Sequence, residues 1–186
     1  VPINFDSETT VLAKSKTVPE LGSRRDFRET PFVTIDGHDA RDFDDAVWAA
    51  PDTASTNQGG WNLQIAIADV AYYVHEGDAL DKTPRLRGNS VYCPDRVVPM
   101  LPESLSTGVC SLKPNEDRAC IVACIKIDAE GNIIKKNFAR GLMRSVARLT
   151  YEQVQSAFDG IHDEVTGSLA TKVIKPLYGA FFALNR

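Results

Sequence analysis

Five aspartates gather between positions 36 and 45, and they are the strongest candidates for chemistry in this sequence: Asp36, Asp39, Asp42, Asp44 and Asp45. Carboxylates held this close repel one another, and burial would raise their pKa values until some took up protons. A cation therefore belongs beside them. Arg41 neutralises at most one charge, whereas Mg²⁺ or Mn²⁺, which prefer carboxylate and water oxygens, would neutralise more.

The spacing lets these carboxylates converge on one point from two chain segments. If Asp36 ends one strand, Asp44 and Asp45 begin the next and point to opposite sides of extended backbone. Such a set suits two metal ions about 3.5–4 Å apart, which stabilise the attacking and leaving oxygens of an in-line phosphoryl displacement. A solvated acidic turn remains the alternative. A calcium loop of the EF-hand type is disfavoured, because His38 and Ala40 stand where its pattern needs acidic or amide ligands.

Strands must position this cluster. Short β-rich runs over 32–35 and 46–49 flank the aspartates. The turn formers at 51–60 predict a hairpin loop, and strict alternation over 61–67 predicts a strand with one buried face. Further strands are expected over 120–127 and, as a single long strand, over 133–149. Four prolines between 84 and 102 predict a long ordered loop.

The C-terminal part of the chain predicts helices. Thr150 and Gln153 fit a capping box, so a helix should run from there to about Phe158. A second helix from Thr166 would place four apolar residues on one stripe, Leu169, Val173, Leu177 and Phe181. We therefore expect an α+β fold, a mostly antiparallel sheet with C-terminal helices.

The bulk composition sets broader limits. With 186 residues, 43% of them hydrophobic, the chain can bury the core of one domain. Its net charge of −4 argues weakly against nucleic-acid binding. No apolar run approaches the roughly 20 residues of a membrane helix. The four cysteines form no CxxC pair, which favours reduced thiols in a cytoplasmic protein over a zinc site.

Four ordered segments identify a resemblance. The aspartates lie in TIDGHDARDFDDAV (34–47), and AIADVAYYV (66–74), RGNSVY (87–92) and VPMLP (98–102) continuing through Cys110-Ser111-Leu112 follow it. Together they resemble the active-site region of the ribonuclease II/ribonuclease R family, the RNB domain. Details such as Gly37 and Tyr72-Tyr73-Val74 are more similar to ribonuclease R than to ribonuclease II.

The resemblance implies an activity and assigns roles. It implies a 3′→5′ exoribonuclease that hydrolyses single-stranded RNA from the 3′ end and releases 5′-mononucleotides. Four aspartates, Asp36, Asp42, Asp44 and Asp45, would hold catalytic Mg²⁺, with Mn²⁺ as an alternative. Asp44 would be indispensable for the chemistry, and Asp39 falls outside the pattern. Tyr92 matches a tyrosine that packs against the terminal nucleotide; without the resemblance, core packing would be the simpler explanation for a lone tyrosine.

Two further features stay open at this stage. Asp69 ends a strand, where a carboxylate is either structural or a neighbour of the site. A basic stripe of four residues, Lys136, Arg140, Arg144 and Arg148, has even spacing on the expected long strand. It either tracks phosphates or forms a solvated basic face.

The resemblance also predicts an incomplete domain. We expect residues 1–30 to form a leader that wraps the domain, and 31–186 to form a partial RNB catalytic domain truncated at its C-terminal end. The rest of the catalytic domain and the flanking OB-type RNA-binding domains would be missing. The chain alone should therefore be inactive and expose apolar surface. Two other functions remain possible, a non-catalytic RNA-binding module and a metal-dependent phosphohydrolase for small nucleotides.

Overall fold

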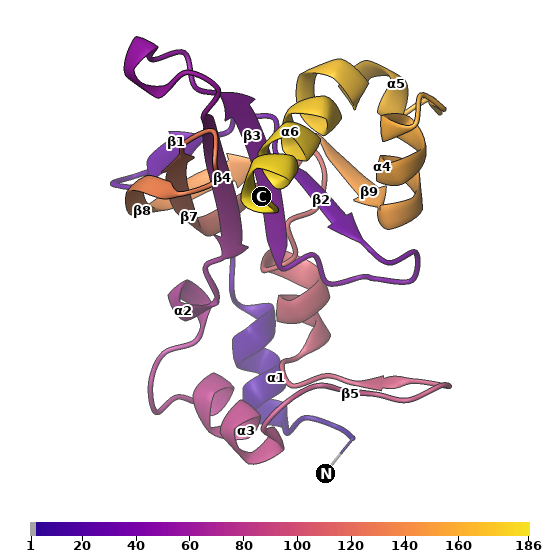
Figure 1. The fold of residues 1–186 in the computed structure, drawn as a ribbon. Coiled ribbons are helices and arrows are strands. Elements are labelled where there is room, and N and C mark those ends of the chain that lie inside the picture. The colour runs from indigo at the N-terminus through magenta and orange to yellow at the C-terminus, as the bar shows by residue number, and fades with distance from the viewer. Residues whose placement is uncertain (1–2) are drawn as a thin grey trace.

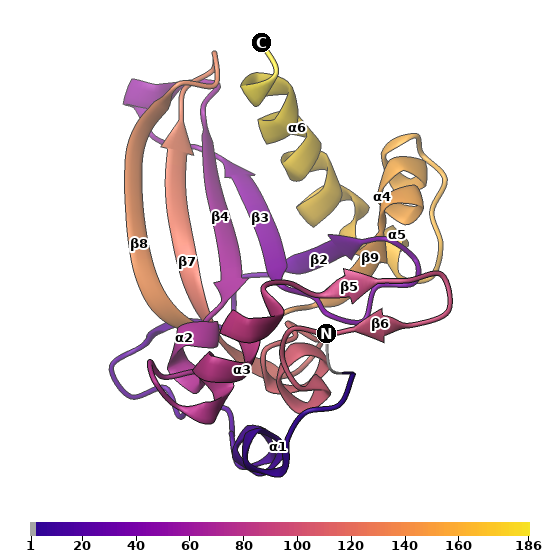
Figure 2. The same cartoon turned by 90° about the horizontal axis from the view of Figure 1, so that it is seen from below.

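In the computed structural model, which describes residues 3–186, a curved sheet of seven strands forms the centre (Figures 1 and 2). Its strand order is β1-β8-β7-β4-β3-β2-β9. The strands are β1 (Arg25–Phe27), β2 (Val33–Asp36), β3 (Asp45–Pro51), β4 (Trp61–Ala68), β7 (Asp117–Ile127), β8 (Ile133–Arg144) and β9 (Ala147–Thr150). A separate two-stranded hairpin, β5 (Val91–Tyr92) and β6 (Val97–Val98), projects from the body, and we call it the arm.

Strand pairing is antiparallel through the middle of the sheet and parallel near its two edges. Strands β8, β7, β4, β3 and β2 are neighbours in that order, and each adjacent pair is antiparallel. Strand β1 runs parallel to β8, and β9 runs parallel to β2. The expected α+β fold, with a mostly antiparallel sheet and C-terminal helices, is confirmed, as is the hairpin loop that joins β3 to β4.

The helices form two groups, one beyond an end of the sheet and one packed beside β2 and β3 (Figure 1). The first contains α1 (Ser7–Lys14), α2 (Val70–Tyr73), α3 (Ala79–Arg87) and the short irregular helix η2 (Ser104–Val109). The second contains α4 (Tyr151–Phe158), α5 (Thr166–Leu169), η3 (Ala170–Ile174) and α6 (Lys175–Leu184). A single 3₁₀ turn, η1 (Ser55–Asn57), lies in the β3–β4 loop. None of the helices in residues 3–186 has the length and apolar composition that crossing a bilayer requires.

Each helix group has its own hydrophobic core. Phe32 belongs to the core formed with the first group, and its neighbour Val33 belongs to the core formed with the second. This division follows from the alternation of side chains along a strand. The predicted capping box is confirmed, because the Thr150 hydroxyl accepts from the Gln153 N–H and the Gln153 side chain accepts from the Thr150 N–H.

Three sequence expectations were wrong in detail. The long strand over 133–149 divides at Ser145 and Val146, because Val146 donates its N–H to Phe32 and turns the chain toward β2. The region 84–102 is not all loop, since it holds the end of α3 and the whole arm. The helix expected from Thr166 is built from three consecutive pieces, α5, η3 and α6.

The segment predicted as a leader, 1–30, contributes helix α1 and strand β1. Its first two residues lie outside the described residues. Strand β1 pairs with β8, and Phe27 is buried in the first core. Helix α1 packs against α3 and η2. The division of the chain at residue 30 stays a prediction.

Candidate active site

The aspartates lie on the loop that joins β2 to β3. Asp36 is the last residue of β2 and Asp45 is the first of β3, while Asp42 and Asp44 lie on the loop between them. The two strands pair through Val33 and Val47. Because the strands diverge beyond that pair, residues 37–44 form a wide loop that carries its acidic side chains toward solvent. We call residues 36–45 the aspartate loop.

Ser111 and Leu112 fasten the backbone of this loop to the first core. The buried Ser111 hydroxyl accepts a hydrogen bond from the Phe43 N–H at 3.0 Å and donates to the Arg41 carbonyl at 3.4 Å. The Leu112 N–H donates to the Phe43 carbonyl at 2.8 Å. On the other side, Ala68 at the end of β4 donates to the Asp44 carbonyl at 2.9 Å. These bonds fix the part of the loop that carries Asp42 and Asp44.

Arg148 holds the opposite end of the aspartate loop. Its Nη2 donates to the carbonyl oxygens of Gly37 at 2.8 Å and His38 at 2.6 Å. Its guanidinium carbon lies 5.7 Å from the centroid of the Phe43 ring. Strand β9 brings Arg148 there because it runs parallel to β2, with Thr34 opposite Arg148. The positive charge also favours the ionised form of Asp36.

Two aspartates of the loop have raised pKa values. Partial burial raises the pKa of Asp44 above its usual 3.8, and the charges of Asp42, Asp45 and Asp36 raise it further. Burial also raises the pKa of Asp36, and Asp45 is the next contributor. The Asp36 Oδ2 atom is buried and accepts no hydrogen bond within the described chain. A bound cation would lower both pKa values and give the Asp36 Oδ2 atom a partner.

The carboxylates are neighbours, but they do not form a finished metal cage. Within residues 3–186, no group of three or more His, Cys, Asp or Glu side chains is placed to hold a metal ion. The predicted ligands are nevertheless close enough that the charges of Asp42 and Asp45 raise the pKa of Asp36 and of Asp44. Their donor atoms are all carboxylate oxygens, which suit Mg²⁺ or Mn²⁺. The residues therefore fit such an ion chemically, and the side chains would have to close around it.

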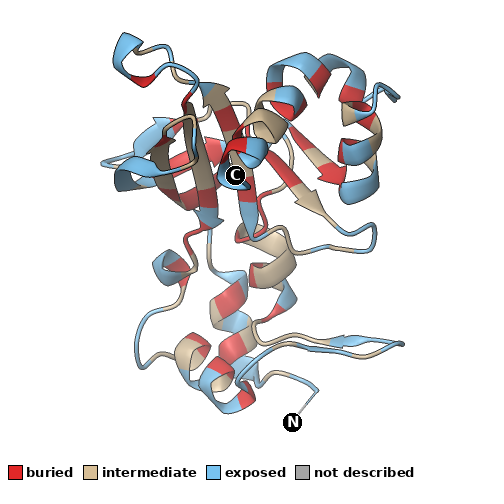
Figure 3. Ribbon diagram, viewed as in Figure 1, coloured by how far each residue is buried: buried red, intermediate tan, exposed pale blue. Residues whose placement is uncertain are grey.

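Tyr92 lies on the arm and reaches toward the aspartate loop. Its hydroxyl donates to the Asp42 Oδ2 at 3.2 Å. Partial burial raises the pKa of the Tyr92 phenol, and the nearby Asp42 charge adds to the effect. The side chain is 68% exposed, so core packing does not explain it. Figure 3 shows that most of the arm around it is exposed as well.

Asp69 has a structural setting beside the first core. Its side chain is fully buried, and Arg24 Nη1 lies 2.9 Å from its Oδ2. The geometry of this ion pair is not that of a hydrogen bond, so charge attraction holds it. Arg24 also donates to the Gly141 carbonyl and lies over the Tyr72 ring. This arginine thus ties the N-terminal segment to β8 and α2.

The predicted basic stripe does not lie on one strand. Arg148 is on β9 at the aspartate loop, as described above. Arg144 pairs with Asp117, and Arg140 Nε lies 3.7 Å from the Asp69 carboxylate. The expected even spacing on one strand is therefore wrong for Arg148, while Lys136, Arg140 and Arg144 do lie on β8.

Ser111 and Arg148 were missed as site residues. The Cys110-Ser111-Leu112 segment could have pointed to Ser111, but its role depends on a contact between positions that are 68 residues apart. Arg148 was assigned to the wrong strand, because the local alternation continues across Ser145 and Val146.

Comparison with known proteins shows where this arrangement recurs. A sequence model of the RNB domain matches residues 24–185. The ribonuclease R of Vibrio parahaemolyticus is 48% identical over 155 residues, which cover 82% of this chain and 18% of that protein. The ribonuclease R of Escherichia coli (strain K12) is 46% identical over 158 residues, covering 84% of this chain and 19% of that protein. The chain thus spans about a fifth of the length of these curated relatives.

Solved structures share the fold of this chain. Mycoplasma genitalium RNase R in complex with double-stranded RNA has a TM-score of 0.88 at 26% identity, covering 98% of this chain and 32% of that chain. A yeast pseudonuclease has a TM-score of 0.66 at 19% identity, covering 83% of this chain and 19% of that chain. At that lower identity the likeness concerns the fold alone.

Proposed function

Because this chain belongs to the RNB domain family, we propose that it supplies the metal-binding aspartates of a 3′→5′ exoribonuclease of the ribonuclease R type. The observation that carries the proposal is the aspartate loop, which brings four carboxylates together from two strand ends, so that burial and the neighbouring carboxylate charges raise the pKa of Asp44 and of Asp36. The proposed reaction is hydrolysis of the 3′-terminal phosphodiester of single-stranded RNA, with release of 5′-mononucleotides.

Asp36, Asp42, Asp44 and Asp45 would hold the ion, Mg²⁺ or Mn²⁺. When bound, such an ion lowers the pKa of water and neutralises charge on a phosphoryl group. Asp36 and Asp45 are the main proposed ligands, since they are anchored in β2 and β3. Asp42 supports the site, and Asp44 is the carboxylate on which the chemistry most depends.

The remaining residues of the site orient these carboxylates. Ser111 and Leu112 fix the backbone beside Asp42 and Asp44, and Arg148 fixes the turn after Asp36. Rigid support of this kind matters, because catalysis depends on geometry set before the reaction. Asp39 is exposed at the loop tip, where it contacts His38, and it has no proposed part in metal binding.

Tyr92 is proposed to bind the RNA near its 3′ end. Aromatic side chains hold single strands by stacking on bases, worth about 1–3 kcal/mol per base and tolerant of sequence. The Tyr92 ring is exposed while its hydroxyl is held by Asp42, so a base has access to it beside the aspartates. Tyr92→Ala should change the length of the end product, and an unchanged product ladder would contradict the stacking role.

We propose that these 186 residues are inactive, or nearly so, without the further parts found in the longer relatives. Large apolar side chains are exposed on the sheet and on α6, among them Ile67, Phe138 and Phe181, as expected of a surface that packs against more protein. A cytoplasmic location is part of the same proposal. Robust processive degradation of RNA by this chain alone would contradict the proposed inactivity.

A non-catalytic RNA-binding module, one that has lost its active site, is the second candidate. The presence of all four aspartates argues for the enzyme. Comparing mononucleotide release from a 3′-tailed RNA with hydrolysis of a small phosphodiester would also separate an exoribonuclease from a small-nucleotide hydrolase.

The deciding experiment uses Asp44→Asn in the full-length enzyme, with Asp39→Asn as the matched control. We expect the Asp44 variant to lose cleavage while it still binds RNA, and the Asp39 variant to keep both. An active Asp44→Asn enzyme would overturn the assignment.

A further inference from the structure

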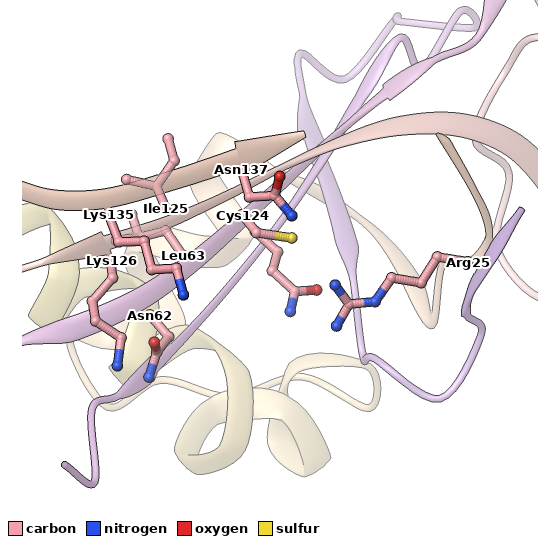
Figure 4. Close-up of a pocket in the computed structure, with 9 residues that line it drawn as sticks. Arg25, Asn62, Leu63, Cys124, Ile125, Lys126, Lys135 and Asn137 are labelled. Carbon is pink, nitrogen blue, oxygen red and sulfur yellow. The ribbon is translucent and has the colours of Figure 1, made fainter. Parts of the chain in front are cut away.

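A polar groove runs across the sheet away from the aspartate loop. It lies over β1, β8, β7 and β4, and six polar side chains line it: Arg25, Asn62, Gln64, Lys126, Lys135 and Asn137 (Figure 4). We call it the amide–cation groove. The pairing register explains the cluster, because Asn62, Lys126 and Lys135 form one row across three strands. Gln64, Cys124 and Asn137 form the adjacent row on the same face.

Two cations of this groove have no carboxylate partner within residues 3–186. A carboxylate beside the groove, Asp52, is almost fully buried and already contacts Lys126 at 2.8 Å and Asn57 at 2.8 Å. These contacts hold the pKa of Asp52 below its usual range. Arg25 and Lys135 are exposed, and neither forms an ion pair with any residue in the described part of the chain. Two cations thus stand open to an anionic ligand.

The groove also offers both kinds of hydrogen-bonding group. Asn62 and Asn137 carry amide donors, while the Gln64 Oε1 atom is buried and receives no hydrogen bond from residues 3–186. A complementary ligand therefore presents anionic oxygens together with a donor. The phosphates and 2′-hydroxyls of RNA supply both.

The dimensions favour a linear polyanion over a small anion. Arg25 lies opposite Gly141 on β8, and from there to Lys135 the strand rises by roughly 20 Å. Along β4, the distance from Asn62 to Ala68, which bonds the aspartate loop, is again roughly 20 Å. The Asn62–Lys135 end of the groove is therefore well away from the aspartates, whereas Arg25 lies three strands across from Ala68 in the same row. RNA bound along the groove would run from the Ala68 row toward the far end of the sheet.

We propose that the amide–cation groove binds the sugar–phosphate backbone of RNA at a distance from the 3′ end being cleaved. This inference rests on the proposed exoribonuclease function, and it assigns that enzyme a second RNA contact. The groove strengthens the hold on long substrates. It does not touch the terminal nucleotide, so it leaves the chemical step unaffected.

The binding test uses full-length enzyme in the Asp44→Asn background, so that RNA is not degraded. Arg25→Ala with Lys135→Ala is compared with Lys136→Ala, which is the neighbouring lysine on the opposite face of β8. The affinity for poly(A) is measured over a range of salt concentrations. Each lost phosphate contact on a single strand should lower the salt slope by about 0.7, so the double variant should lose about 1.4. The Lys136 variant should match the parent.

Activity on substrates of different length provides the second arm. With Asp44 intact, the double variant should cleave a tetranucleotide at the parental rate but lose affinity and processivity on poly(A). An unchanged salt slope, or an equal loss with Lys136→Ala, would show that the amide–cation groove does not bind the RNA backbone. So would a double variant that keeps its hold on poly(A) but loses binding to polyglutamate, since the site would then fit an acidic peptide. If the parent releases no mononucleotides, the proposed function fails, while the salt slope still decides the groove.

Discussion

Removing the Ser111 hydroxyl should loosen the aspartate loop without touching an aspartate. Ser111 is fully buried, and its Oγ is the hydrogen-bond acceptor for the Phe43 N–H at 3.0 Å. In Ser111→Ala that donor and the Arg41 carbonyl both lose a partner. Leaving one such group unsatisfied costs about 1–3 kcal/mol. We therefore expect the free energy of unfolding of the chain to fall by about that amount, as measured by urea denaturation.

Removing the Ser111 hydroxyl should also slow RNA cleavage. If the loosened loop must be ordered again in the transition state, about 1–3 kcal/mol corresponds to a fall of about 5- to 150-fold in kcat/KM. This is measured on a 3′-tailed RNA with the full-length enzyme. Ser106→Ala is the control, because that hydroxyl makes no hydrogen bond within residues 3–186, and a change within about 0.5 kcal/mol is expected. Parental stability and parental kcat/KM in Ser111→Ala would refute this view of the loop.

Three further predictions concern stability. Arg24→Met leaves the buried Asp69 carboxylate with only the more distant Arg140, which should cost up to about 3–5 kcal/mol in urea denaturation, and adding Asp69→Asn should recover part of the loss. Hydrogen bonds from Thr166 lower the pKa of Asp163 to about 2 from 3.8. The advantage of the parent over Asp163→Asn should therefore be full above about pH 4 and shrink as the pH falls toward 2; a constant difference would contradict it. The pKa of Asp44 is raised in the folded chain above its usual value of 3.8. Ionising this side chain therefore costs stability once the pH rises above that value. Asp44→Asn should thus raise the Tm of the metal-free chain at pH 7 but not at pH 3, and Mg²⁺ should raise the parental Tm more; a lower Tm in the variant would contradict this.

Local patterns predicted much of the central sheet. The alternation in 61–67 and 120–127 identified β4 and β7, because a buried face of a strand imposes period two on the side chains. Thr150 and Gln153 identified the start of α4, since a capping box is made within four residues. The β-rich runs over 32–35 and 46–49 correctly placed the aspartate loop between two strands, β2 and β3.

Contacts between distant segments could not be predicted in this way. The parallel pairing of β2 with β9 joins Asp36 to Thr150, and nothing in the local sequence of either strand specifies its partner. The position of Arg148 at the aspartate loop depends on that pairing. Likewise, Ser111 has an ordinary residue type, and its role appears only when the chain folds back on Phe43.

The most direct test of the central claim is anomalous diffraction from crystals of the full-length enzyme grown with Mn²⁺ and RNA. We predict an ion bound by carboxylate oxygens from Asp36, Asp42, Asp44 and Asp45, with the 3′-terminal phosphodiester beside it. An aspartate loop that holds no ion at saturating Mn²⁺, or an ion bound elsewhere with the RNA 3′ end, would contradict the account.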